Sequence, residues 1–288
     1  MESKLVATLV TSQALHDFSV FIKTIKLWNI ESLPTLYVFG DAQTEIAVKA
    51  HKYPGQLHFK NCLEPYTNMS RQTMERIPGK HSPTLWMDFQ MEKLSLLDWV
   101  FKENAAAANK GVFYFDADIC FLAPLPDVPS DAQVGLCPHH IKRSDEGRFG
   151  RFNAGYVWMR TPDAIEAWRA ACSKSRFFEQ AALEVFETEE WRSRLYEFPI
   201  QHNYGWWRLW QGERPAQEIL YDWGITKDHP NTAGIIVNRI PLASVHTHWQ
   251  TDDYATQIFN RVVIDYLKTL EMVNDSARKL LKIINSNQ

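Results

Sequence analysis

The chain has 288 residues, of which 45% are hydrophobic and 23% are charged, and its formal net charge is −3. This length and apolar content are enough to bury a sizeable core, so we expect one α/β domain spanning residues 1–288. No basic surplus or basic run is present, which excludes a typical nucleic-acid-binding protein. No leader-like start and no apolar stretch near the ~20 residues of a membrane span are visible, so we expect no integral membrane segment. We therefore expect a cytoplasmic protein, in a bacterium or in a cell that hosts a virus.

The first 40 residues predict a strand, a helix and a second strand. Residues 5–10 form a short apolar run with β-branched side chains, which is typical of a buried strand. Residues 17–28 carry apolar side chains at helical spacing, and residues 35–39 form another apolar run that ends at a glycine. This order indicates a right-handed crossover and a parallel sheet.

The rest of the chain alternates helices and strands. We expect helices at 86–101, 162–172, 179–187 and 254–273 with a short last helix, and strands at 111–115, 134–137, 155–159, 234–237 and 243–249. Two polar segments, 60–83 and 138–151, read as irregular loops, and the second is rich in charge and looks mobile.

The C-terminal segment 254–288 reads as amphipathic helices that pack on the domain. A location on a membrane surface is the alternative, because basic residues on these helices would suit it. Those residues are Lys268, Arg278, Lys279 and Lys282.

Two carboxylates, Asp116 and Asp118, follow the apolar strand at 111–115. Open α/β sheets place their ligands at the carboxyl ends of strands, and residues i and i+2 of a strand point to the same side. Two carboxylates aimed at one place repel each other unless a cation lies between them. Hard divalent ions such as Mg²⁺ or Mn²⁺ prefer these oxygens and also bridge phosphates. An Asp-x-Asp pair is common, however, and a simple turn after a strand is the alternative.

A second pair, His246 and His248, shares one face of the expected strand 243–249. One of them is a candidate metal ligand. The same spacing also occurs in zinc hydrolases, but no third His or carboxylate stands nearby at a suggestive spacing.

The string Gly111-Val-Phe-Tyr-Phe-Asp-Ala-Asp118, followed by Ile-Cys-Phe-Leu-Ala-Pro-Leu-Pro126, resembles the metal motif of nucleotide-diphospho-sugar glycosyltransferases of the GT-A fold. Other segments resemble further motifs of these enzymes in matching order. They are the start at 8–12, the Phe-Asn-Ala-Gly sequence at 152–155, the Phe-Glu-Gln sequence at 178–180 and the Val-His-Thr-His-Trp sequence at 245–249. In overall look, the chain also resembles the soluble single-domain enzymes of large algal viruses (chloroviruses), which include a xylosyltransferase.

The resemblance implies a GT-A fold, in which helices flank a mixed but mostly parallel sheet. It implies transfer of a sugar from a nucleotide-diphosphate donor, a UDP-sugar such as UDP-xylose, to a glycan hydroxyl with Mn²⁺ or Mg²⁺ as cofactor. The implied metal ligands are Asp116, Asp118 and one histidine, with His246 favoured over His248. The implied donor-binding residues are Thr8, Thr11, Ser12, Lys93, Asp116, Ala117, Asn153, Ala154 and Gly155.

The resemblance also suggests catalytic and acceptor residues. An inverting enzyme needs a carboxylate base, for which Glu179 is the first candidate and Asp145 the next, followed by Glu146. In a retaining enzyme, Glu179 and Gln180 would instead hold a sugar. The suggested acceptor-binding residues are Gln180, Asn203, Tyr204, Trp207 and Trp249, with core packing as the alternative for the tryptophans. The basic residues that would neutralise the diphosphate are Lys93, Lys142, Arg143, Arg148 and Arg151.

Two further functions compete with glycosyl transfer. A nucleotidyltransferase that makes a nucleotide sugar would need a glycine-rich basic loop after the first strand, but residues 12–17 contain no glycine. A non-catalytic carbohydrate-binding protein is suggested by the 11 tryptophans, although it would not need the aspartate pair.

Overall fold

The computed structural model describes residues 3–104, 107–227, 229 and 231–286. Its centre is a seven-stranded sheet in which one strand, β7, runs antiparallel to both neighbours while the other neighbouring pairs are parallel. The strand order is β3 (Leu57–Asn61), β2 (Thr35–Gly40), β1 (Leu5–Val10), β4 (Val112–Phe115), β7 (Phe152–Met159), β6 (Val134–Pro138) and β8 (Leu195–Glu197). The expected mixed, mostly parallel sheet is therefore confirmed.

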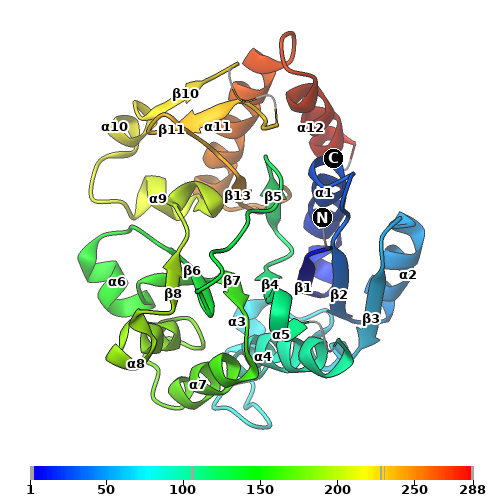
Figure 1. Cartoon of the computed structure of the whole chain (residues 1–288), viewed down its shortest axis with the longest axis vertical. Helices are drawn as coiled ribbons and strands as arrows, with labels where there is room; N and C mark the ends of the chain where they lie inside the picture. Colours follow the sequence, from blue (N-terminus) through cyan, green and yellow to red (C-terminus); the bar gives the residue numbers. More distant parts are fainter. Residues whose placement is uncertain (1–2, 105–106, 228, 230, 287–288) are drawn as a thin grey trace.

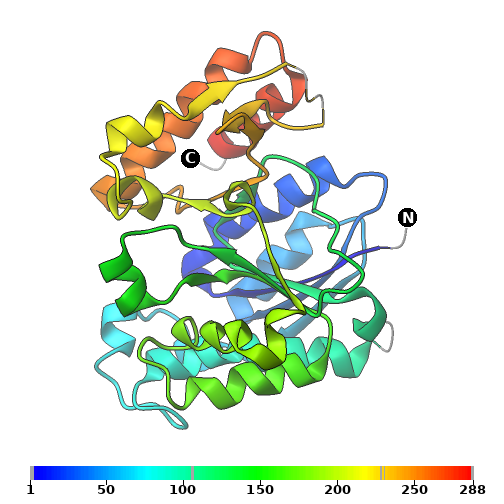
Figure 2. The same cartoon turned by 60° about the vertical axis from the view of Figure 1, so that its left-hand side comes forward.

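Helices cover both faces of this sheet, as Figures 1 and 2 show. Helices α4 (Leu85–Glu103) and α7 (Pro162–Cys172) lie on one face, and α1 (Leu15–Trp28) and α2 (Ala42–His51) lie on the other. Strand β1 shows why both faces are apolar. Its alternate side chains enter two different cores: Leu5, Ala7 and Leu9 pack with α4, and Val6 and Val10 pack with α1.

A third layer lies at the end of the molecule that is uppermost in Figures 1 and 2. It contains α11 (Tyr254–Leu270), α12 (Asp275–Asn285) and the antiparallel strands β10 (Trp223–Ile225), β11 (Ile235–Val237) and β12 (Ile240–Pro241). The side chain of Asn274 accepts a hydrogen bond from Ala277 N (3.0 Å) and so caps α12. The apolar faces of α11 and α12 are buried in a core shared with α1, so protein covers them. In the part of the chain that the structure describes, no helix is both long and apolar enough to cross a bilayer.

A second small sheet joins this layer to the central sheet. Strand β13 (Ser244–His246) pairs antiparallel with β5 (Ile119–Phe121) and parallel with β9 (Tyr204–Gly205). The remaining elements are short: η1 (Ser12–Ala14), η2 (Glu64–Tyr66), α3 (Arg71–Met74), α5 (Ala107–Lys110), α6 (Arg143–Phe149), η3 (Ala181–Glu187), α8 (Glu189–Arg192), η4 (Ile200–His202), α9 (Trp207–Trp210) and α10 (Ala216–Leu220).

Several expected boundaries were wrong. The segment 138–151 contains helix α6, which buries no side chain, so no apolar period marked it. Helix α2 was missed because its hydrophobic pattern is weak, although the Asp41 side chain caps it by accepting from Thr44 N (2.8 Å). The segment 179–187 is a 3-10 helix from Ala181. Strand β7 begins at Phe152 and is therefore longer than the expected strand at 155–159, so that the Phe-Asn-Ala-Gly sequence lies inside it.

Candidate active site

The first part of the candidate site is the end of strand β4. This strand is buried along its whole length, and the chain leaves the sheet directly after it at Asp116. The backbone N–H of Asp116 donates to Gly155 O (2.9 Å), and the N–H of Ile119 donates back to Asp116 O (3.2 Å). This turn fixes Asp116 and Asp118 at the carboxyl end of the strand, where α/β sheets bind ligands.

His246 reaches the same place from the other end of the chain. Strand β13 ends at His246, which lies opposite Ile119 of β5, and the N–H of Thr247 donates to Asp118 O (3.1 Å). The small sheet therefore brings together an aspartate and a histidine that are far apart in the sequence.

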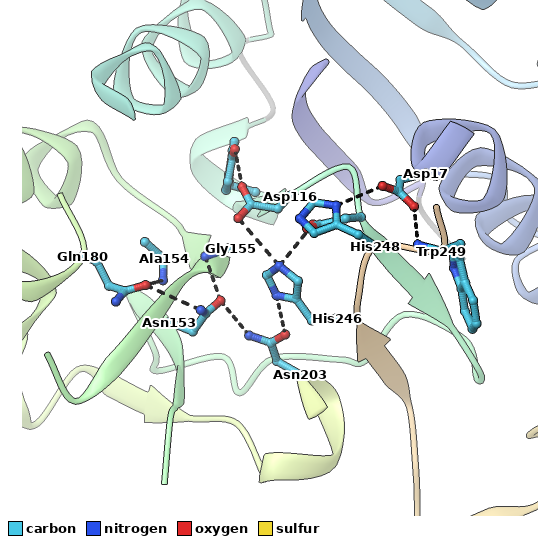
Figure 3. A network of polar contacts seen from close by, with 12 residues as sticks. Asp17, Asp116, Asn153, Ala154, Gly155, Gln180, Asn203, His246, His248 and Trp249 are labelled. Carbon is cyan, nitrogen blue, oxygen red and sulfur yellow. Dashed lines mark hydrogen bonds and ion pairs between the residues drawn. The ribbon is translucent and has the colours of Figure 1, made fainter. Parts of the chain in front are cut away.

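Asp116, Asp118 and His246 form a compact group of potential metal ligands. Figure 3 shows the Asp116 and His246 side chains of this group pointing toward one another. One ligand atom from each residue lies within 4.8 Å of the others. His246 Nε2 is 3.1 Å from Asp118 Oδ1 and 3.9 Å from Asp116 Oδ2. Two carboxylates and one imidazole are a donor set suited to a divalent cation.

The hydrogen bonds of His246 leave its second nitrogen free for such a cation. His246 Nδ1 is 3.0 Å from Asn203 Oδ1, and Asn203 Nδ2 donates to Asn153 Oδ1 (2.9 Å). Because an amide oxygen only accepts, Nδ1 carries the proton, and in a neutral ring the Nε2 lone pair faces the two aspartates. The buried Asp118 Oδ1 accepts no hydrogen bond in the structure. A lone pair and a carboxylate oxygen at this distance require a proton or a cation between them, so these residues fit a metal ion.

His248 lies beside this group and pairs with two carboxylates. Its Nε2 is 3.1 Å from Asp118 Oδ2, and its Nδ1 is 3.0 Å from Asp17 Oδ2. The charge of Asp118 raises the pKa of His248 to about 9; burial opposes this rise, and Asp17 adds to it. Burial alone would raise the pKa of Asp118, but its interactions with the neighbouring His246 and His248 lower it. We expected His248 to share a strand face with His246, but β13 ends at His246 and His248 lies beyond the strand.

A buried lysine connects the aspartates to Glu179. Lys93 Nζ on α4 is 2.9 Å from Glu179 Oε1 and 3.3 Å from Asp116 Oδ1, and Tyr114 Oη donates to the same Asp116 oxygen (2.7 Å). Burial by itself would lower the pKa of Lys93, but the charges of Asp116 and Glu179 outweigh burial and raise it. The Lys93 ammonium is therefore fully charged and fixes the orientation of both carboxylates.

A cavity of about 510 Å³ opens over these residues. We call it the main cavity. Predicted site residues that line it are Thr11, Lys93, Asp116, Ala117, Asp118, Gly155, Glu179, Gln180 and His248. The predicted site residues outside its lining are Thr8, Ser12, Asp145, Glu146, Asn153, Ala154, Asn203, Tyr204, Trp207, His246 and Trp249. The basic side chains that were expected to neutralise the diphosphate also lie outside it, namely Lys142, Arg143, Arg148 and Arg151.

Several of the residues outside the lining contact the residues that form the cavity or the metal group. Asn153 Oδ1 accepts from Gly155 N (3.0 Å), and Ser12 N donates to Asp41 Oδ2 (2.7 Å). The Trp207 ring packs edge-on against His246, with their centroids 5.0 Å apart. The Trp249 side chain is buried in the C-terminal core, while its backbone N–H donates to Asp17 Oδ1 (2.9 Å).

Aromatic side chains form another part of the lining of the main cavity, which we call the aromatic wall and which was not predicted from the sequence. Its lining includes Tyr66, Trp86, Phe89, Phe177 and Phe178. The two neighbours of Glu179 were a usable signal, because Phe177 and Phe178 directly precede it. Tyr66, Trp86 and Phe89 gave none, since aromatic residues at the start of a helix are usually core.

Comparison with solved structures assigns the fold. The galactosyltransferase LgtC, in complex with donor and acceptor sugar analogs, matches over 99% of this chain and 96% of its own, with a TM-score of 0.54 and 12% identity. An active-site mutant of LgtC gives the same TM-score at 13% identity over 91% of this chain and 95% of its own. The glycosyltransferase GlyE of Streptococcus pneumoniae TIGR4 matches over 99% of this chain and 62% of its own, with a TM-score of 0.53 and 12% identity. The chain has the GT-A fold.

The neighbours of this GT-A chain in fold space are glycosyltransferases. No model of a protein family matches the sequence, and no curated protein matches it. At these identities the similarity establishes the GT-A fold, and the activity must be argued from the site.

The hydrogen bond that His246 Nδ1 donates to Asn203 Oδ1 leads to a direct prediction for the GT-A site. Replacing Asn203 by Ala removes the acceptor for Nδ1, so His246 loses its fixed tautomer and orientation. We expect Mn²⁺ affinity to fall by about 10- to 100-fold, the usual cost of losing such a partner. Titration calorimetry with Mn²⁺ measures this change. The matched variant Asn61→Ala, at an exposed residue of β3, should bind Mn²⁺ like the unmodified protein, and an unchanged affinity in Asn203→Ala would contradict the proposed orientation.

A buried histidine behind the GT-A site predicts a pH effect on stability. Burial lowers the pKa of His139 to about 3; its hydrogen bond to Gly150 O (3.0 Å) opposes the shift, and the Arg208 charge adds to it. The pKa of a histidine in an unfolded chain is about 6.5, so below that pH the unfolded chain binds a proton at this residue and the folded chain does not. The free energy of unfolding should therefore fall between about pH 6.5 and pH 3, by about 1.4 kcal/mol per pH unit from this residue. Denaturant unfolding at pH 7, 6 and 5 measures the slope, and His139→Gln should have a shallower one.

Proposed function

We propose that this chain is a metal-dependent glycosyltransferase that moves a sugar from a nucleoside diphosphate donor, a UDP-sugar, to a hydroxyl of a glycan. The observation that carries the proposal is the Asp116–Asp118–His246 group at the carboxyl end of β4 in a GT-A fold. The fold neighbours support it, since LgtC is a galactosyltransferase that was crystallised with donor and acceptor sugar analogs.

Asp118 and His246, together with Asp116, would hold the cofactor, for which we propose Mn²⁺ or Mg²⁺. When bound, a divalent cation supplies Lewis-acid stabilisation of the diphosphate leaving group. The residues around it keep the ligands in place: Asn203 orients His246, and Lys93 with Tyr114 orients Asp116. These partners reduce the reorganisation that the site would otherwise need when the donor binds.

The nucleoside half of the donor is proposed to lie along the ends of β1 and α1. Thr11 and Asp17 line the main cavity there, and Ala117 lines it between the two aspartates. Thr8 and Ser12 are one layer behind and would act through the backbone position of Thr11. Asn153 would act in the same indirect way, because its side chain holds the N–H of Gly155.

The transferred sugar is proposed to face Glu179 and Gln180, which line the same cavity. Of the three candidate bases, the geometry favours Glu179, because Asp145 and Glu146 lie on α6 outside the lining of the main cavity. The Glu179 carboxylate is 2.9 Å from the Lys93 ammonium, which fixes its direction. The acceptor is proposed to enter against the aromatic wall, whose faces suit sugar rings. Core packing suits the Trp207 and Trp249 side chains better.

A thermal-shift experiment tests the proposal. We expect UDP to raise the melting temperature in the presence of Mn²⁺ and much less in its absence. Indifference to UDP, GDP and other nucleotides with or without metal would sink the proposed activity and leave a carbohydrate-binding protein as the better candidate. A screen of donor hydrolysis across common nucleotide sugars then identifies the sugar. UDP-xylose, the similarity to algal-virus enzymes and a cytoplasmic location stay predictions.

A further inference from the structure

Helix α4 presents one row of side chains to the main cavity, and this row contains a buried glutamine. Trp86, Phe89, Gln90 and Lys93 line the cavity, and their spacing places them on one face of the helix. Gln90 is only 8% exposed. None of the roles proposed for the metal group, Lys93 or Glu179 depends on this residue.

The amide of Gln90 has no partner in the protein. No hydrogen bond joins it to any other residue that the structure describes, although a primary amide offers one acceptor oxygen and two N–H donors. Other amides that are at least as buried do have a hydrogen bond, namely those of Asn153, Gln201, Asn203 and Asn260. Leucine has a similar helix propensity and would be more favourable to bury here, so the fold does not account for a glutamine. A ligand in the cavity can supply the missing partners.

The neighbours of this glutamine on α4 both lie against the segment that contains Glu179. Lys93 Nζ, one turn further along the helix, is 2.9 Å from Glu179 Oε1. One turn earlier, the Trp86 ring shares a guanidinium with the Phe178 ring. This guanidinium belongs to Arg71 and lies 5.2 Å from the Trp86 centroid and 5.7 Å from the Phe178 centroid. The amide therefore lies between two contacts that join α4 to residues 178–179, beside the position proposed for the transferred sugar.

The charges on this face of α4 favour an uncharged partner for the amide. The Lys93 ammonium is already shared by Asp116 and Glu179, at 3.3 and 2.9 Å. The Arg71 guanidinium is paired with Glu75 at 2.7 Å. A carboxylate placed beside the amide would therefore lie close to Glu179 without a cation of its own. A hydroxyl group carries no charge, and it can both donate to the amide oxygen and accept from the amide N–H.

We propose that Gln90 determines which donor sugar the chain accepts, by forming hydrogen bonds with a hydroxyl group of a neutral transferred sugar. This inference rests on the proposed function, in which that sugar faces Glu179. Lys93 reaches Asp116 of the metal group, so the amide lies about one helical turn from the position of the diphosphate, where the attached sugar would be. A site that hydrogen-bonds a substrate hydroxyl rejects donors that cannot supply it, because its buried polar group is then left unpaired.

Calorimetric titration of the full chain with Mn²⁺ present tests this proposal. The ligands are UDP, UDP-glucose, UDP-galactose, UDP-xylose and UDP-glucuronate. In Gln90→Leu we expect the affinity for the best neutral donor to fall about tenfold, while the affinity for UDP stays within about twofold of that of the unmodified chain. UDP lacks the sugar, so its unchanged affinity shows that the contacts of the nucleotide and the metal are intact. The unmodified chain should bind UDP-glucuronate roughly tenfold more weakly than the best neutral donor.

The pattern of losses identifies the hydroxyl group. A loss confined to UDP-glucose and UDP-galactose assigns the amide to the exocyclic hydroxymethyl group, and a loss shared by UDP-xylose assigns it to a ring hydroxyl. Equal losses for UDP and for the donors would place Gln90 against the nucleoside and overturn the proposal. Unchanged donor affinities, or a preference for UDP-glucuronate, would overturn it as well. An unmodified chain that binds no nucleotide with Mn²⁺ present would instead overturn the proposed function, and this inference with it.

Melting temperatures separate a role in recognition from a role in the fold. Gln90→Leu removes no hydrogen bond within the protein, so without ligand it should melt at or above the temperature of the unmodified chain. A fall of more than about 4 °C would show that the amide supports the fold, and would contradict the proposal. Gln217→Leu, the matched variant at an exposed residue of α10, should change neither donor affinity nor melting temperature.

Discussion

Replacing Asp118 by Asn is expected to abolish the Mn²⁺-dependent stabilisation by UDP and to reduce sugar transfer by about a thousandfold. Asp118 directs one carboxylate oxygen to His246 Nε2 and the other to His248 Nε2, each at 3.1 Å. The substitution keeps the size of the side chain but removes its charge, and an amide is a weaker ligand for a hard divalent cation. Thermal shift with UDP and Mn²⁺ measures binding, and single-turnover transfer measures the chemistry.

Asp145→Asn is the matched control for this prediction. It removes an equal charge from α6, outside the lining of the main cavity, and should leave UDP binding and transfer within about twofold of the unmodified chain. UDP binding that still depends on Mn²⁺ in Asp118→Asn would show that the cation is held elsewhere. A loss of activity in Asp145→Asn equal to that in Asp118→Asn would instead identify α6 as the source of the base.

Replacing Gly155 by Ala should have the second largest effect, although it adds a single methyl group. A Cβ at this position would collide with Asp116 Oδ2, and would lie 2.9 Å from Asp116 Cγ and 2.5 Å from His246 Cε1. Because Gly155 is inside β7, the backbone has no room to move the methyl away. The ligands must shift instead, and a shift of this size typically costs about a hundredfold in rate. We expect Mn²⁺ affinity and transfer to fall together.

Gly224→Ala tests whether the effect comes from the site. Gly224 also lies in a strand, β10, but a Cβ there would meet Ile236 side-chain atoms at 3.4 and 3.5 Å, which is ordinary contact. This variant should bind Mn²⁺ and transfer sugar normally. A Gly155→Ala enzyme with normal metal affinity would mean that Asp116 and His246 do not act as ligands together.

The parts of the fold that could be predicted are those with a local pattern. The strand at 5–10 and the strand before Asp116 are marked by continuous apolar runs, and the helix after the first strand is marked by apolar residues at period 3.6. The aspartate pair was found in the same way, since a local motif carries it. His246 needed the resemblance as well, because its position beside Asp118 depends on the pairing of β13 with β5.

The residues that support the potential metal ligands are not marked by any local pattern in the sequence. Asn203 and His139 are single polar residues in irregular segments, and Asn153 was predicted to touch the donor although it lies behind Gly155. These residues meet only because strands that are distant in the sequence pair with one another, and hydrophobic periodicity does not reveal such pairings. Asp17 was missed because an acidic residue in the first turn of a helix is ordinary, and only the fold places it against His248.

The pairing of β5 with β13 also has a consequence for how the chain folds. It joins residues 119–121 to residues 244–246, so the metal group cannot assemble until most of the polypeptide has been made and its last third has docked. Contacts of such long sequence separation form late, because the entropy of closing a large loop must be lost before they contribute. During synthesis, Asp116 and Asp118 would therefore lie at the end of a completed β4 before His246 is in place beside them. The group is therefore expected to stay incomplete until residues 244–246 have been made and have paired with β5.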